Sequence, residues 1–282
     1  MRNTCINLRD LGIAILATVC VPLVQNCVYM IASALYNNRG VELPTSLLSY
    51  VVLILIFGCA YFICPWMYSS STDHNKKPHK KSAKARKPVL RFFIIFMMCA
   101  TLVAAGIFLQ YFSTGILTLV DRYHPELMQS YRKLTDSSFS LSNGALRVFT
   151  VILLAPIGEE LVFRGVCMHS FERAFRFRFS RIAAVLLSSL LFGLYHGNIV
   201  QFCYSVPIGI LFALVAEWTS SLLPGMFLHL VINGFSYILE VLPFPRVTPQ
   251  FLISSGALSI LYFVTIYILS RMYKDAKSHE IF

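Results

Sequence analysis

Three charged side chains interrupt an apolar stretch that is long enough to cross a lipid bilayer. Glu159, Glu160 and Arg164 lie within 148–168, where most of the other residues are apolar. Each such charge costs roughly 2.5–3.5 kcal/mol at the centre of a membrane-spanning helix on insertion scales. A chain seldom carries three of them in one span unless they pair or take part in chemistry. This segment is therefore the first candidate for a functional site.

The spacing of the three charges predicts different roles for them. Glu160 and Arg164 are four residues apart, so on a helix they share one face and can form an ion pair whose partners offset each other's burial. Glu159 lies about 100° away round the helix and cannot share the arginine equally. A desolvated carboxylate is a stronger base, which suits a general base that acts on water. The alternative is that all three charges form one structural ion cluster.

Two histidines and an asparagine occur on later apolar segments. His196 ends the sequence Phe-Gly-Leu-Tyr-His, while His229 and Asn233 are four residues apart and would point in one direction from a helix. Taken singly, His196 could be a hydrogen-bonded residue at the membrane interface. The His229–Asn233 pair could equally join neighbouring helices through hydrogen bonds. Together with the two carboxylates, these residues predict one intramembrane site built from three spans.

The composition predicts that a membrane-spanning helical bundle positions these residues. Among 282 residues, 57% are hydrophobic and 13% are charged, whereas soluble domains have about 25% charged residues. We therefore predict an all-α fold, a polytopic membrane helix bundle with about eight transmembrane helices. Gln25 and Asn26, polar residues of the first apolar run, are expected to face the bundle. The apolar runs lie at about 11–36, 47–68, 89–112, 148–170, 182–196, 199–217, 222–239 and 251–272.

Basic residues determine the predicted orientation of the bundle. The net charge of +11 lies mostly between the apolar runs, which indicates membrane orientation rather than nucleic-acid binding. Eight spans put both termini on one side, and the positive-inside rule assigns that side to the cytoplasm, together with the basic loop 75–88. The loop could also bind anionic lipid headgroups. In the basic segment 171–181, Phe171, Phe175 and Phe179 share one helical face, which predicts a short helix in the headgroup plane.

Other hydrolytic and metal-binding patterns do not occur in the sequence. The chain contains no HExxH zinc motif, no GxSxG nucleophile elbow and no GxGD motif of the intramembrane aspartyl proteases. The eight cysteines form no CxxC pair and show no Cys/His ligand spacing, which argues against a disulfide framework and a cysteine-rich zinc site. Hydrolysis by activated water is the chemistry that remains.

In this order, the three motifs resemble the signature of the CPBP intramembrane proteases. That family includes the type II CAAX prenyl proteases and the bacterial bacteriocin-immunity (Abi) proteins. The similarity covers about 145–240 and rests on EExxxR at 159–164, FxxxH at 192–196 and HxxxN at 229–233. One EExxxR motif is a weak signal, but three motifs in order on separate spans are a strong one.

The resemblance implies a role for each candidate residue. Glu159, with His196, would orient and deprotonate the attacking water. His229 and Asn233 would stabilise the oxyanion of the tetrahedral intermediate, while the ion pair of the first motif would hold the site together. The implied catalytic set is Glu159, Glu160, Arg164, His196, His229 and Asn233.

The same resemblance leaves the cofactor open and bears on the substrate. Glu159, His196 and His229 could supply a three-ligand open zinc site, or they could act without a metal. Phe192 is expected to pack behind His196. The eukaryotic prenyl-protein proteases carry additional histidines just after this motif, whereas this chain has Asn198 and Ile199. The departure favours a bacterial-type member and weakens the case for a prenylated CAAX substrate.

Four regions are predicted along the chain. N-terminal transmembrane helices with the basic cytoplasmic loop occupy 1–112, and an interfacial or lid segment occupies 113–144. The CPBP-like catalytic core covers 145–240, and a C-terminal transmembrane helix and tail cover 241–282.

The leading functional prediction is an intramembrane endopeptidase that hydrolyses a peptide bond of a membrane-associated substrate, either CAAX-like or a bacteriocin-type peptide. Its predicted partners are that peptide or protein and the lipid bilayer, with no nucleic acid. The predicted location is the bacterial cytoplasmic membrane. One alternative is a non-enzymatic membrane regulator or immunity protein of the same fold. Another is a proton-coupled transporter in which Glu159 and His196 form a relay.

Overall fold

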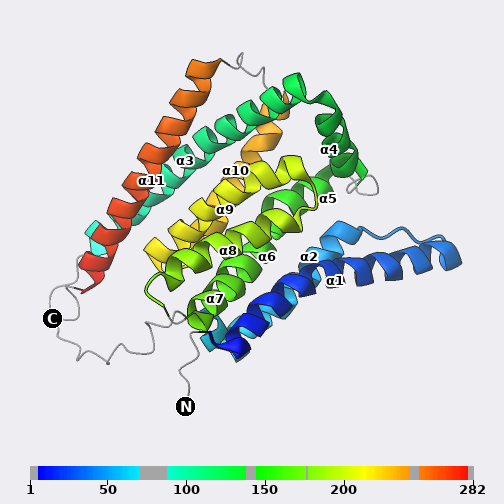
Figure 1. The fold of residues 1–282 in the computed structure, drawn as a ribbon, viewed down its shortest axis with the longest axis horizontal. Helices are drawn as coiled ribbons and strands as arrows, with labels where there is room; N and C mark the ends of the chain where they lie inside the picture. Colours follow the sequence, from blue (N-terminus) through cyan, green and yellow to red (C-terminus); the bar gives the residue numbers. More distant parts are fainter. Residues whose placement is uncertain (1–5, 70–87, 138–143, 176, 242–247, 279–282) are drawn as a thin grey trace. The chain divides into compact units, whose positions relative to one another are not determined.

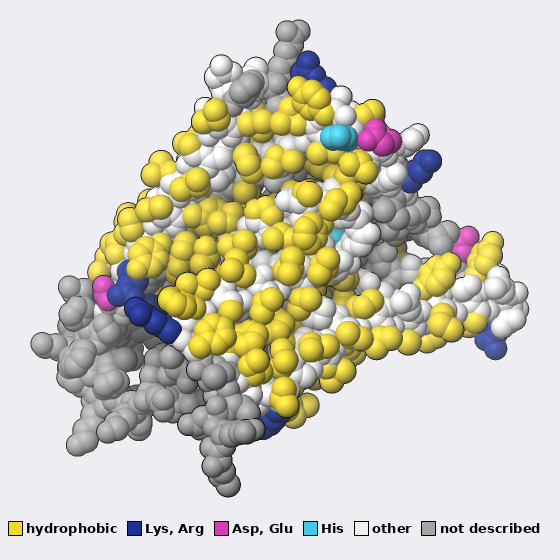
Figure 2. All heavy atoms as spheres, viewed as in Figure 1, with side chains coloured by type: hydrophobic (Ala, Val, Ile, Leu, Met, Phe, Trp, Pro, Cys, Tyr) yellow, Lys and Arg dark blue, Asp and Glu magenta, His cyan; other side chains and the backbone are white. Residues whose placement is uncertain are grey.

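The computed structural model describes residues 6–69, 88–137, 144–175, 177–241 and 248–278, and these ranges are mostly helical and contain no β-strand. Five helices are long and apolar enough to cross a membrane, and two shorter apolar helices accompany them at Ser180–Tyr195 and Leu223–Leu239. The prediction of an all-α, polytopic bundle is therefore confirmed. Figure 2 agrees with this conclusion, because hydrophobic side chains cover most of the face in view.

Two compact units divide the chain. Unit 1 comprises Met1–Ser71 and Val120–Ala213, and unit 2 comprises Thr72–Leu119 and Leu214–Phe282. The α-helices of unit 1 are labelled in Figure 1: α1 Leu8–Arg39, α2 Thr45–Ile63, α4 Pro125–Ser137, the helical run from α5 to α7, α8 Ser180–Tyr195 and the larger part of α9 Ile199–Thr219. A short 3-10 helix, η1 Pro65–Tyr68, follows α2.

A helical hairpin formed by α1 and α2 flanks the motif-bearing segment of unit 1. Gly40 ends α1 with a φ of 64° and donates its N–H to the carbonyl oxygen of Tyr36 at 2.8 Å. Glycine suits this left-handed position because it has no Cβ. From this turn the chain reverses into α2. Helix α1 packs against α7 and η4, while α2 packs against α6, η3 and η4.

The motif-bearing span alternates between α-helical and π-helical turns. Its elements follow one another without a break as α5 Gly144–Phe149, η3 Thr150–Leu154, α6 Ala155–Glu160, η4 Leu161–Met168 and α7 His169–Ala174. The π-helical element η3 ends two residues before Pro156. A π-helical turn is a local adjustment that satisfies backbone groups near a proline in a membrane helix. Such turns occur often at functional sites, and here they bracket both glutamates.

The basic segment after this span differs from its prediction. Helix α7 ends at Ala174, and Phe175 is extended, with φ of −94° and ψ of 120°. The predicted helix over 171–181 is therefore wrong. Tertiary contacts decide the conformation, because Phe175 forms a β-bridge with Ile6 and stacks on Phe171 at a centroid distance of 6.1 Å.

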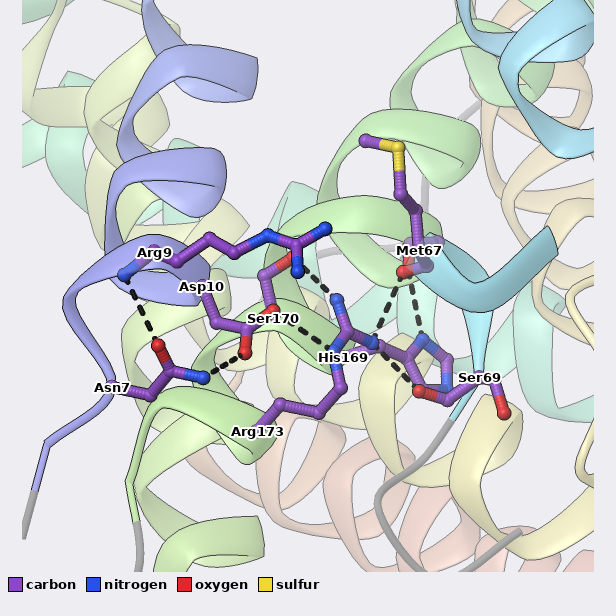
Figure 3. Close-up of polar contacts among 9 residues, drawn as sticks. Asn7, Arg9, Asp10, Met67, Ser69, His169, Ser170 and Arg173 are labelled. Atoms are coloured by element: carbon purple, nitrogen blue, oxygen red, sulfur yellow. Dashed lines mark hydrogen bonds and ion pairs between the residues drawn. The ribbon is translucent and has the colours of Figure 1, made fainter. Parts of the chain in front are cut away.

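At this end of unit 1, polar contacts join three segments that are distant in sequence (Figure 3). Arg173 of α7 donates to Asp10 of α1 at 3.1 Å and to the carbonyl oxygens of Met67 and Ser69 at 3.3 and 2.7 Å. The guanidinium groups of Arg9 and Arg173 also lie 4.7 and 5.6 Å from the ring centroid of Trp66. We call Arg9, Asp10, Trp66 and Arg173 the basic-end cluster.

Unit 2 contains α10 Leu223–Val241, α11 Pro249–Ser278, the end of α9 and most of α3 Pro88–Tyr123. Helix α3 packs on α10, where a Cβ added to Gly106 would lie 2.6 Å from Cγ1 of Val231. It also packs on α11 through stacked rings of Phe108 and Tyr262, whose centroids are 5.7 Å apart. A glycine at position 106 thus permits the close approach of two helices.

The boundary between the third predicted span and the segment after it differs in the structure. Helix α3 continues to Tyr123, past the end predicted at 112, so the proposed lid segment 113–144 begins inside this helix. Helix α4 follows, and a lid role for it stays a prediction. The basic loop 75–88 lies outside the described residues except for Pro88, which starts α3.

Candidate active site

The predicted ion pair of the first motif is present and deeply buried. Nη1 of Arg164 donates to Oε1 of Glu160 at 3.0 Å, and both side chains are almost completely shielded from solvent. Nη2 of Arg164 donates to the carbonyl oxygen of Gly209 in α9 at 3.1 Å. The arginine thus connects the motif-bearing span to another helix as well as to its own carboxylate.

Aromatic rings complete the surroundings of Arg164. Its guanidinium carbon lies 4.3 Å from the ring centroid of Phe192 and 5.2 Å from that of Phe212. Cation–π contacts of this kind offset part of the desolvation of a buried cation. A Cβ added to Gly209 would lie 3.0 Å from Nη2 of Arg164, so a glycine makes room for the guanidinium group.

Glu159 is held by a different set of groups. It is 5% exposed, and its Oε1 accepts a hydrogen bond from the hydroxyl group of Tyr50 at 2.7 Å. The hydroxyl groups of Tyr50 and Tyr195 are 3.2 Å apart, and Nε2 of Gln25 donates to the Tyr195 hydroxyl at 2.6 Å. A chain of polar groups therefore runs from α1 through α8 and α2 to Glu159. Gly158 permits it, since a Cβ there would lie 3.3 Å from Cδ1 of Tyr50.

His196 directly follows α8, where its ring is fixed on two sides. The ring packs edge-on against Phe192 with centroids 5.0 Å apart, as predicted, and it also contacts Tyr195. Its Nδ1 lies 2.9 Å from Nε2 of Gln201, at the start of α9. Gly197, with a φ of 69°, makes the tight turn that brings the first residues of α9 back towards His196.

His229 and Asn233 lie on α10 of unit 2. The four-residue spacing predicted to put them on one face falls within a continuous helix, Leu223–Val241. His229 is buried, with 6% of its surface exposed. Their role beside the groups of unit 1 stays a prediction.

The predicted zinc ligands are Glu159, His196 and His229, all of which the structure describes. Among the described residues, no group of three His, Cys, Asp or Glu side chains is arranged to hold a metal ion. Oε1 of Glu159 already accepts from Tyr50, and Nδ1 of His196 lies beside Gln201. The three-ligand zinc site stays a prediction, and the proposed reaction uses only water and groups of the protein itself.

Three residues near the candidate groups were not predicted as site residues. Tyr195 directly precedes His196, and this adjacency was the one local signal that could have indicated it. Tyr50 lies 109 positions before Glu159, and Gln201 follows His196 by five positions on the next helix. Side chains brought together from separate helices leave no periodic pattern in the sequence.

Comparison with known proteins supports the resemblance of the motif-bearing segment. Residues 141–235 match the family described as type II CAAX prenyl endopeptidase Rce1-like. This range includes all six predicted site residues, and the matched family is a family of membrane proteases. The family resemblance is thus confirmed for this part of the chain.

Two curated bacterial relatives match parts of the chain. The "Putative membrane peptidase YdiL" of Bacillus subtilis is 25% identical over 139 residues, which are 49% of this chain and 55% of that protein. The "Membrane-embedded CAAX protease MroQ" of Staphylococcus aureus is 31% identical over 97 residues, which are 34% of this chain and 39% of that protein. The matches thus span about half or less of each relative. No solved structure gives a significant match.

Proposed function

We propose that this protein is an intramembrane endopeptidase that hydrolyses a peptide bond of a membrane-associated peptide or protein. The proposal rests on the surroundings of the Glu159 side chain. This buried carboxylate lies next to the Glu160–Arg164 ion pair and accepts a hydrogen bond from Tyr50. It also lies in the segment that matches a family of membrane endopeptidases.

In the proposed reaction, Glu159 takes a proton from a water molecule whose oxygen attacks the carbonyl carbon of the scissile peptide bond. His196 orients that water, and His229 with Asn233 donates hydrogen bonds to the oxyanion that forms. The tetrahedral intermediate then collapses, the carbon–nitrogen bond breaks, and Glu159 returns the proton to the leaving amine. Two new termini result, and the enzyme regains its starting protonation.

The proposal includes an orientation in the membrane. The basic-end cluster brings together the start of α1, the end of η1 and the end of α7. These three segments are expected to meet in this way if all of them lie on the cytoplasmic side of the membrane. His196 follows the other end of α8, whose 16 residues extend about 24 Å. With the basic end in the cytoplasm of a bacterial cell, the groups around Glu159 and His196 lie towards the outer half of the membrane.

The decisive experiment compares membrane peptides in cells that carry wild-type protein, Glu159→Gln or Glu126→Gln. The control removes a carboxylate from α4 that is exposed, and both changes are nearly isosteric. Peptides released by the wild-type protein should persist with Glu126→Gln and disappear with Glu159→Gln at equal protein abundance. An identical peptide pattern for all three would overturn the endopeptidase and favour a membrane regulator.

Zinc content is measured on the same purified proteins. Hydrolysis without a metal predicts no stoichiometric zinc and no loss of cleavage after dialysis against a chelator. One zinc per chain, lost in both His196→Ala and His229→Ala, would replace the metal-free reaction with the three-ligand form.

A further inference from the structure

The turn after α8 contains a hydrogen-bond network whose direction can be worked out from one unambiguous donor. The backbone N–H of Gln201 can only donate, and its nitrogen lies 2.7 Å from Oδ1 of Asn198. The Asn198 side chain must therefore present its oxygen to this N–H and turn its amide nitrogen the other way. The orientation of the Asn198 side-chain amide is thus fixed by a backbone donor, whatever the tautomer of His196.

The second amide orientation follows from the first. Nδ2 of Asn198 lies 3.2 Å from the carbonyl oxygen of His196 and 3.0 Å from Oε1 of Gln201. Both of these oxygens accept, so the Asn198 amide donates to each. With its oxygen committed to Asn198, the Gln201 amide presents Nε2 to Nδ1 of His196 at 2.9 Å.

The direction of the Gln201–His196 hydrogen bond determines the tautomer of the histidine ring. An amide nitrogen is a donor and never an acceptor, so Nδ1 of His196 must accept, and the neutral ring carries its proton on Nε2. The opposite tautomer would require the Gln201 amide to flip, which would set two donors, Nε2 of Gln201 and Nδ2 of Asn198, against each other. The contacts of the ring with Phe192 and Tyr195 hold its plane while this hydrogen bond fixes its protons.

We propose that Gln201 is a positioning residue that holds His196 as the Nε2–H tautomer, so that His196 donates a hydrogen bond during hydrolysis. The base then is Glu159 alone, which narrows the sequence prediction that His196 shares in removing the proton. This inference rests on the proposed endopeptidase activity for its catalytic consequence, while the tautomer itself can be measured on protein of any activity.

The test uses ¹⁵N-histidine-labelled full-length protein in detergent micelles. The chain has seven histidines, and the signals of His196 are identified by their loss in His196→Gln. We expect the wild-type ring to show a protonated Nε2 and an unprotonated Nδ1. Gln201→Glu should move the proton to Nδ1, because a carboxylate accepts where the amide donated. Gln250→Glu, the same change at an exposed position of α11, should leave every histidine signal unchanged.

Activity supplies the second readout. Gln201→Glu should lower kcat about 10- to 100-fold with KM within about twofold, because loss of one positioned donor typically costs 10²–10³ in rate and part of the donation is regained. Gln201→Met, which offers neither donor nor acceptor, should give mixed tautomers and an intermediate kcat.

Either of two results would overturn the inference. One is a wild-type His196 with its proton on Nδ1, and the other is a kcat that stays at the wild-type value although the tautomer changes. A wild-type protein that cleaves no peptide refutes the proposed function instead, and the NMR signals then still decide the tautomer.

Discussion

Two of the ion pairs in unit 1 have nearly the same length but very different origins. In the basic-end cluster, Arg173 meets Asp10 at 3.1 Å, and in the first motif Arg164 meets Glu160 at 3.0 Å. The first pair joins residues 163 positions apart, with about a tenth of each side chain exposed. The second joins residues four positions apart on one helix and excludes solvent.

The difference shows what each pair contributes. Arg173 also donates to two backbone carbonyl oxygens and to Ser170, so the basic-end pair fastens α1, η1 and α7 together where charges can remain near water. The buried pair must offset its own desolvation, and a partner on the same helix is available to Arg164 before the bundle packs. Because Arg164 is occupied by Glu160, the neighbouring Glu159 can engage Tyr50 instead.

The largest effect is expected from breaking the buried pair. Glu160→Gln leaves the Arg164 charge in the core without its carboxylate, so we expect a loss of about 3–5 kcal/mol in the free energy of unfolding. Glu160→Gln combined with Arg164→Met should recover most of that loss, because the unpaired cation at position 164 is then removed as well. Denaturant titration in micelles measures both, with Glu126→Gln as the exposed control. A double variant no more stable than Glu160→Gln would mean that the pair stabilises the bundle outright.

Local spacing made part of the molecule predictable. Each of the eight apolar runs is occupied by helix, and the four-residue interval between Glu160 and Arg164 indicated their pairing before any packing was known. The polar side chain of Gln25 within an apolar run also predicted that it faces other helices, and it donates to Tyr195. The same prediction was wrong for Asn26, which is exposed. Two adjacent residues on a helix differ by about 100°, so one packed face rarely accommodates both.

Contacts between distant segments account for what could not be predicted. Nothing near Phe175 in the sequence indicates that it pairs with Ile6, so its helical spacing with Phe171 suggested a longer helix than the structure has. Tyr50 is one of many aromatic residues in apolar helices, and only packing brings its hydroxyl group to Glu159. The orientation of the Gln201 amide likewise depends on a network that forms only once α9 turns back towards His196.

A smaller effect is expected at the basic-end cluster. Asp10→Asn should lower the free energy of unfolding by about 1.5–3 kcal/mol, the range for hydrogen bonds to charged groups. Arg173→Gln should cost more than Asp10→Asn, since it also removes donors to Met67 and Ser69. Arg132→Gln is the matched control, because its pair with Asp121 is exposed and such pairs contribute about 0–1 kcal/mol.

Thermal unfolding of the two single variants and the double variant gives the coupling between Asp10 and Arg173. We expect the double variant to be destabilised by clearly less than the sum of the single changes. Additive losses would show that the two residues act separately and that the basic end is held by the carbonyl and Trp66 contacts alone.

The smallest effect on stability, about 1 kcal/mol, is expected for Tyr50→Phe, which removes one hydroxyl group beside Glu159 and keeps the ring. The same change should lower the rate of peptide cleavage about tenfold, because the carboxylate loses the donor that orients it. Tyr61→Phe removes a hydroxyl group from an exposed ring on the same helix and serves as the control. Glu160→Gln should therefore lower mainly the free energy of unfolding, whereas Tyr50→Phe should lower mainly the rate of cleavage. A Tyr50→Phe protein that unfolds as readily as Glu160→Gln while cleaving at the wild-type rate would show that the Tyr50–Glu159 contact belongs to the framework and has no part in the reaction.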